Sequence, residues 1–214
     1  TIMFLRTLAA RWAERLHSSA GHPDPDPYRR ALTAYALEGY LALIYSILLL
    51  CLAGWLVGAF RETLIAAAAA AVLKTFAGGP HLSTPTRCAF AGAALFAGLG
   101  YLAAHFPGNR GKAVFLSLLI LANLLVWFRA PVETPGKPLT ERQRTVLGVL
   151  ARLIIGLQTL AWFLLPPRSW LRAMVLGSTM ASLGLSEHLR RFLEVFDRAL
   201  TEARARLRCD RKEG

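Results

Sequence analysis

The chain has 214 residues, of which 55% are hydrophobic and 18% are charged, and its formal net charge is +12. Soluble domains of this size usually carry about a quarter charged residues, so the composition argues against a soluble globular protein. Because the apolar residues fall in long blocks, we interpret the positive charge as the orientation bias of a membrane protein and expect no nucleic-acid partner.

The first segment is predicted to be an amphipathic helix that lies on a membrane surface. In residues 1–20, apolar side chains recur near helical spacing with arginines between them. Residues 21–34 begin with three prolines within five residues, which restrict the backbone and remove hydrogen-bond donors. We predict a linker over 21–34.

Six apolar segments follow, and the pattern is typical of helices that cross a hydrocarbon core of roughly 30 Å. They are residues 39–60, 63–77, 89–106, 113–128, 146–165 and 171–189. The second centres on six alanines, Ala66 to Ala71, and small-residue helices pack closely in lipid. Asn123 and Gln158 are predicted to form hydrogen bonds between helices. The sequence predicts an all-α, polytopic membrane bundle with one domain over 35–189.

Lys and Arg are distributed unevenly among the segments that join these spans. If both termini lie on one side, that side holds nineteen Lys and Arg and the other holds five. The positive-inside rule then places both termini and the segment before the third span in the cytoplasm of a multi-pass cell-membrane protein. The basic tail, 190–214, is predicted to be a cytoplasmic helix that contacts solvent or lipid.

A polar segment from Lys74 to Cys88 separates the second and third spans. It places His81 seven residues before Cys88, after the flexible pair Gly78-Gly79. Thiolate is the nucleophilic form of cysteine, and a neighbouring histidine can accept its proton. This pair is the candidate catalytic centre.

The residues just before the cysteine are suited to begin a helix. Ser83 or Thr84 can cap it, and Pro85 is favoured at the first helical position. Cys88 then lies about one turn into the helix, where the helix dipole favours a thiolate and N–H groups can stabilise an oxyanion. Arg87 adds positive charge nearby.

The same residues also have structural interpretations. A cysteine at a helix start commonly packs as a small apolar side chain. Glu38 can orient His81 or contact substrate, or it can be an interfacial carboxylate at a helix end. Arg152, within the fifth span, is expected to face the bundle interior, either in an ion pair with Glu38 or Glu187 or in a substrate role.

The three cysteines, Cys51, Cys88 and Cys209, have no paired spacing. An odd count without such spacing argues against a disulfide framework, and no Cys/His pattern indicates a zinc site. We therefore predict that the protein uses no metal and no other cofactor.

Three segments, in order, resemble one known family. They are residues 35–39, the motif from Lys74 to Cys88, and the proline-rich loop 130–139. Together they are similar to the accessory gene regulator B (AgrB) family over roughly residues 35–189. Members of that family are integral-membrane cysteine endopeptidases that process precursors of Gram-positive quorum-sensing peptides. Lys74 stands where the family often has arginine.

The resemblance implies roles for the residues of the motif. Cys88 would be the nucleophile and His81 the general base. The candidates for substrate binding or oxyanion support are Lys74, Gly78, Gly79, Ser83 and Glu38.

By the same resemblance, the substrate is an AgrD-like propeptide with an amphipathic N-terminal helix and an acidic C-terminal tail. Cleavage would leave a peptidyl thioester on Cys88, which a cysteine or serine of the peptide would capture as a thiolactone or lactone. A homodimer is a further hypothesis. The alternative is a small membrane transporter or permease subunit without peptidase activity, in which residues 74–88 form a re-entrant segment.

Overall fold

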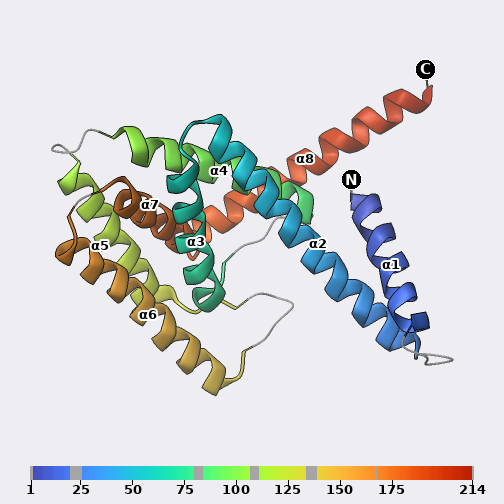
Figure 1. Ribbon diagram of the computed structural model, residues 1–214, viewed down its shortest axis with the longest axis horizontal. Coiled ribbons are helices and arrows are strands. Elements are labelled where there is room, and N and C mark those ends of the chain that lie inside the picture. Colours follow the sequence, from blue (N-terminus) through green and yellow to red (C-terminus); the bar gives the residue numbers. More distant parts are fainter. Residues whose placement is uncertain are drawn as a thin grey trace.

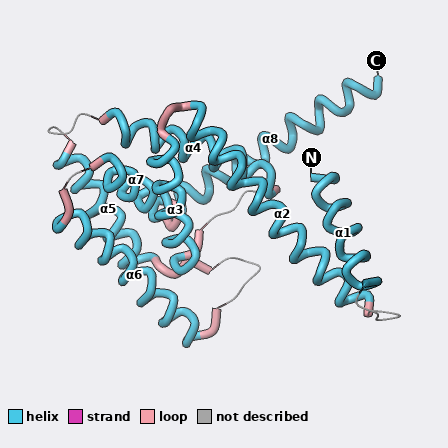
Figure 2. The backbone as a smooth tube through the Cα atoms, in the orientation of Figure 1, coloured by secondary structure: helices cyan, strands magenta, loops and turns pink. Residues whose placement is uncertain are grey.

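The computed structural model describes residues 2–19, 26–79, 84–106, 111–133, 139–166 and 168–213, and for 2–5, 19, 200 and 203–213 it describes the helix backbone alone. All regular structure in these ranges is α-helical (Figure 2). The helices of the described ranges are α1 (Ile2–Ser19), α2 (Pro27–Leu56), α3 (Phe60–Ala77), α4 (Pro85–His105), α5 (Lys112–Arg129), α6 (Glu141–Leu164), α7 (Ser169–Leu183) and α8 (Glu187–Glu213).

Four of the described helices, α2, α4, α5 and α6, are long and apolar enough to cross a membrane. They correspond to the first, third, fourth and fifth predicted spans, and they confirm the all-α membrane bundle. The other two predicted spans correspond to α3, which carries three charged residues, and to α7, which has 15 residues. At 1.5 Å per residue α7 extends for only about 22 Å. The predicted sixth span, 171–189, was therefore too long, because α7 ends at Leu183 and α8 begins at Glu187.

Helices α3 and α7 pack against each other inside the bundle, and Figure 1 shows α3 between α2 and α7. A Cβ atom at Gly177 of α7 would overlap the carbonyl oxygen of Ala66 in α3, and one at Gly100 of α4 would overlap Thr63. Small side chains let helix backbones approach closely, which supplies the van der Waals contact that holds helices together in lipid. The alanine run of α3 thus packs as predicted.

Hydrogen bonds between helices add to this packing. Asn123 of α5 donates to Thr159 Oγ1 of α6 at 2.9 Å. Ser178 of α7 donates to Gln158 Oε1 of α6. Both predicted inter-helix roles are confirmed, and these bonds tie α6 to α5 and α7.

Arg152 forms neither of the ion pairs considered for it. Its guanidinium lies 5.3 Å from the ring centroid of Trp127 and donates to the Trp127 carbonyl at 3.4 Å. Glu38 pairs instead with Arg6 of α1, and Glu187 pairs within α8. A guanidinium over an aromatic face is stabilised by the ring quadrupole, so Arg152 joins α6 to the end of α5.

The N-terminal helices α1 and α2 pack against each other as a hairpin at one side of the bundle (Figure 1). Helix α2 begins earlier than predicted, at Pro27, so residues 27–34 of the predicted linker are helical. Asp26 caps this helix by accepting a hydrogen bond from the Tyr28 N–H at 3.1 Å, with Pro27 in the first turn. Proline is tolerated there because its missing N–H would have no partner within the helix.

Candidate functional site

The polar segment begins where α3 ends, at two glycines with left-handed backbone. Gly78 has φ 80° and Gly79 has φ 148°, a conformation that favours glycine. The Val132 N–H donates to the Ala77 carbonyl at 2.9 Å, and a Cβ at Gly78 would overlap the Val132 carbonyl oxygen. Gly78 is therefore required for the loop after α5 to reach the end of α3.

The segment ends at the capped start of α4, as predicted. Thr84 accepts a hydrogen bond from the Arg87 N–H at 3.4 Å, and Pro85 stands in the first turn. The Cys88 N–H donates to the Thr84 carbonyl at 3.1 Å, so Cys88 is the fourth residue of the helix. Two N–H groups of this turn are thus occupied by Thr84, and neither is available to an oxyanion in this conformation.

Cys88 and Lys74 line one cavity of about 320 Å³, which we call the Cys88 cavity. Two of its walls are one face of α3 and one face of α4, and residues of α7 and α8 complete the lining. Helix α3 contributes Ala67, Ala70, Ala71 and Lys74, and helix α4 contributes Cys88, Ala91, Gly92 and Leu95. Steps of three and four residues place these side chains on one face of each helix. The thiol of Cys88 is half-buried.

Lys74 faces the Cys88 cavity from α3, opposite the α4 face that carries Cys88. Lys74 and Gly79 also line a second cavity of about 420 Å³, the Val132 cavity, together with Pro131, Val132 and Glu133. A Cβ at Gly79 would lie 3.3 Å from Lys74 Cε, so the absence of a side chain at Gly79 leaves room for the lysine stem. Lys74 therefore stands between the nucleophile candidate and the loop 130–133.

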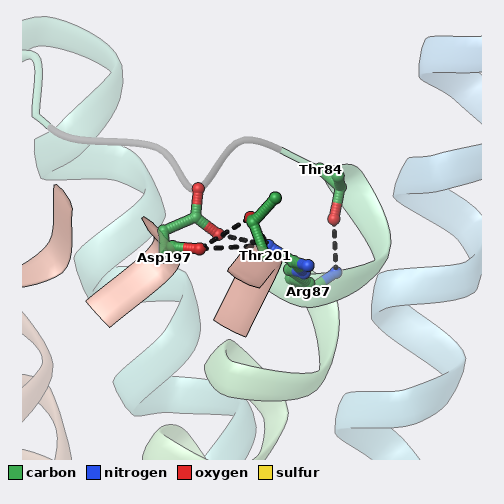
Figure 3. A network of polar contacts seen from close by, with 4 residues as sticks. All are labelled: Thr84, Arg87, Asp197 and Thr201. Atoms are coloured by element: carbon green, nitrogen blue, oxygen red, sulfur yellow. Dashed lines mark hydrogen bonds and ion pairs between the residues drawn. The ribbon is translucent and has the colours of Figure 1, made fainter. Parts of the chain in front are cut away.

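A polar network anchors α8 beside Cys88 (Figure 3). Arg87 Nη1 lies 2.8 Å from Asp197 Oδ1 and donates to Thr201 Oγ1 at 2.9 Å. The side chains of Arg87 and Asp197 are 18% and 15% exposed. Because Asp197 balances the charge of Arg87, the predicted contribution of Arg87 to the charge around Cys88 is reduced.

The family model of Accessory gene regulator B matches residues 9–185. The chain belongs to the AgrB family. No curated protein and no solved structure matches the chain. Membership makes it a multi-pass membrane protein of the agr quorum-sensing system, in a family that processes peptides and has AgrD-like propeptides as partners.

Two of the AgrB motif segments meet in space. The loop 130–133, from the proline-rich AgrB segment, hydrogen-bonds to the end of α3 and lines the Val132 cavity with Gly78 and Gly79. Of the motif candidates, Lys74, Gly79 and Cys88 share the Cys88 cavity. His81 and Ser83 lie outside the described residues, so their predicted roles stay predictions.

Glu38 lies outside both cavities of this AgrB protein. Its carboxylate is 3.0 Å from Arg6 Nε, on the hairpin of α1 and α2, and it does not line either cavity. In this structure Glu38 holds α1 to α2, and a role toward His81 or substrate is a prediction without support from its contacts.

Sequence reasoning missed the part that α8 plays at the AgrB site. Leu189 and Leu193 line the Cys88 cavity, and Asp197 binds Arg87. A signal was present in the spacing, since Leu189, Leu193 and Asp197 follow one another at four-residue intervals on one helix face. In the described ranges no group of three His, Cys, Asp or Glu side chains is arranged to hold a metal ion.

Proposed function

We propose that this AgrB-family protein is an integral-membrane cysteine endopeptidase that removes the C-terminal segment of a short signalling propeptide. The observation that carries the proposal is the placement of Cys88 in an apolar cavity that Lys74 also lines. A thiolate paired with a nearby cation at the start of a helix is the environment in which cysteine becomes nucleophilic.

The first step forms an acyl-enzyme. His81 takes the proton of the Cys88 thiol, and the sulfur attacks the carbonyl carbon of the scissile peptide bond. The carbon–nitrogen bond then breaks, and the leaving amine takes the proton back from His81. The C-terminal segment departs with a free amino group, and the N-terminal part remains on Cys88 as a thioester.

Lys74 is the proposed partner of the oxyanion that forms during this attack. Thr84 occupies the N–H groups of Arg87 and Cys88, which are the donors that a cysteine at a helix start would otherwise use. Lys74 lines the same cavity from the opposing helix, and its protonated side chain is the proposed source of positive charge there. A fixed cation in a site poor in water stabilises developing negative charge strongly.

The second step is the capture of the thioester within the peptide. A cysteine or serine of the bound peptide attacks the acyl carbon, closes a thiolactone or lactone, and returns the Cys88 thiol. Ring closure competes with hydrolysis, so it requires that water be excluded and that the peptide nucleophile be held close. The apolar lining of the Cys88 cavity suits both requirements.

The partner and the orientation follow the same proposal. An AgrD-like propeptide with an acidic tail is attracted to a basic cytoplasmic surface, and the formal charge of +12 supplies such a field. The site then faces the cytoplasm, where the precursor is made. A homodimer remains a hypothesis that cross-linking in membranes would test.

The decisive experiment is coexpression with a tagged propeptide. Cys88→Ala and His81→Ala should abolish release of the C-terminal segment, whereas Cys51→Ala, which alters a half-buried cysteine of α2, should leave release unchanged. A propeptide that lacks its internal nucleophile should accumulate on Cys88 as an adduct that hydroxylamine cleaves. Normal processing by Cys88→Ala would refute the peptidase and favour the transporter or permease alternative.

A further inference from the structure

The lining of the Cys88 cavity is apolar apart from Cys88 and Lys74. In the described part of the chain, the residues that line it besides Cys88 and Lys74 are all Ala, Gly, Leu, Met or Phe. Alanines and a glycine form the walls from α3 and α4, and these short side chains leave the space between the helices open. Its volume of about 320 Å³ lies at the low end of ligand pockets, which span roughly 300–1,000 Å³.

We propose that this cavity is the specificity pocket for the residue whose carbonyl Cys88 attacks, and that it selects a large apolar side chain there. The inference rests on the proposed peptidase function and names its substrate preference. The residue that becomes a thioester is bonded directly to the Cys88 sulfur, and its side chain is therefore only a few bonds from that atom. Since Cys88 itself lines the cavity, the side chain of that residue has the cavity within reach.

The chemistry of the lining determines which side chain is accepted. A large apolar side chain exchanges water for contact with Leu95, Phe96 and Met180. A polar side chain would lose its hydrogen bonds to water, and these walls offer no replacement apart from the cation of Lys74. An alanine would leave most of the volume unfilled. Discrimination in apolar pockets amounts to roughly 10- to 200-fold for each methylene group.

Helix α8 forms one side of this pocket. Leu189 and Leu193 line it, about two turns and one turn before Asp197, respectively, on the same helix face. The ion pair of Asp197 with Arg87 holds that face against the start of α4 (Figure 3). The position of Leu189 and Leu193, and with it the size of the pocket, therefore depends on the ion pair that Asp197 forms with Arg87, the residue before Cys88.

Gly92 provides the test, because it lines the pocket and a Cβ there would meet no atom within 4 Å. Gly98 is the matched control on the same helix, since its Cβ also meets nothing within 4 Å and it does not line the pocket. Both Gly92→Leu and Gly98→Leu replace a helical glycine by leucine, so they share any effect on helix propensity. Each variant is coexpressed with propeptides that carry Phe, Leu, Ala or Asn at the attacked position.

The wild-type protein and Gly98→Leu should process the Phe and Leu propeptides at least tenfold faster than the Ala and Asn ones, on the roughly 10- to 200-fold scale of such pockets. Gly92→Leu should lose this preference and process the Ala propeptide best. Leu193→Ala enlarges the pocket, and it should shift the preference toward Phe over Leu. If Gly92→Leu fails to accumulate in the membrane, Leu193→Ala still tests the proposal.

Two results would overturn the proposal that the cavity selects the side chain of the attacked residue. One is a wild-type protein that processes all four propeptides equally, and the other is a set of Gly92→Leu and Leu193→Ala variants that keep the wild-type order. In both cases the dependence of cleavage on Cys88 would still stand, so the peptidase proposal would survive. Cleavage of all four propeptides by Cys88→Ala would instead refute the peptidase itself.

Discussion

Arg87 and Asp197 are 110 positions apart, and their side chains meet at 2.8 Å one residue before Cys88. Both side chains are largely buried, at 18% and 15% exposure. Removing one partner of such a pair leaves the other charge desolvated and without compensation, which costs more than the pair itself contributes. The start of α4 and the helix α8 are therefore coupled at the site.

We predict that breaking this pair impairs processing more than it impairs folding. Asp197→Asn should lower the processing rate by roughly 10- to 100-fold, the cost of displacing reacting groups by about 1 Å. The exchange of both residues, Arg87→Asp with Asp197→Arg, should restore part of the loss. Glu187→Gln is the control, since it removes an exposed ion pair of the same helix, with side chains 76% and 57% exposed.

The readout that separates positioning from general damage is the preference for the attacked residue. Asp197→Asn should weaken the selection of large apolar side chains, because Leu189 and Leu193 are no longer held against α4. If the rate fell while the preference stayed as in wild type, the ion pair would have only a structural role.

Lys74 is predicted to act through its charge. Lys74→Met should lower the processing rate by roughly 10²- to 10³-fold, as the loss of one oxyanion-binding group does in other enzymes. Lys74→Arg should retain much of the activity because the charge is kept. Lys112→Met, at the first residue of α5, is the control.

Kinetics on detergent-solubilised protein would check this assignment. The loss in Lys74→Met should appear in kcat, because the oxyanion exists only after attack on the carbonyl. A loss confined to KM would show that Lys74 binds the substrate in its ground state and would contradict the oxyanion role.

The local features of the site were predictable from sequence, because short-range chemistry determines them. Thr84, Pro85 and Cys88 occupy the cap, the first turn and the fourth helical position that their residue types favour. The glycine pair at Gly78 ends α3 within the predicted segment. Ala66, Ala69 and Ala70 of the alanine run are buried, because their small side chains allow close packing whichever helix is their neighbour.

The parts that were missed depend on contacts between distant segments. Nothing near Gly78 in sequence indicates that the Val132 carbonyl approaches it, and nothing near Arg87 indicates Asp197. The length of α7 was overestimated, because the apolar residues of 171–189 continue from one helix into the next across a turn at Gly184. A hydropathy average over 171–189 does not detect the turn, whereas the backbone hydrogen bonds show that α7 ends at Leu183 and α8 begins at Glu187.

Gly78 is predicted to be intolerant of any side chain. Gly78→Ala should destabilise the protein by about 2–5 kcal/mol, through its left-handed φ and through overlap with the Val132 carbonyl. Gly58→Ala is a matched control, because Gly58 also has positive φ but its Cβ would meet nothing within 4 Å. The control should lose only about 1–2 kcal/mol.

Thermal unfolding in detergent, followed by loss of soluble monodisperse protein, would compare the two glycine variants. Equal destabilisation by Gly78→Ala and Gly58→Ala would mean that the loop 130–133 does not dock against the end of α3 in the native protein.

The cytoplasmic orientation is predicted from the charge distribution and can be tested with cysteines. In a variant with Cys51→Ala and Cys209→Ala, Cys88 is the one remaining thiol. An impermeant maleimide applied to intact cells should leave it unmodified, and the same reagent should modify it after the membrane is opened. Arg61→Cys, with Cys88→Ala in the same background, places an exposed thiol at the start of α3, on the side with fewer basic residues, and should react from outside. Modification of Cys88 in intact cells would reverse the orientation and would separate the site from a precursor made in the cytoplasm.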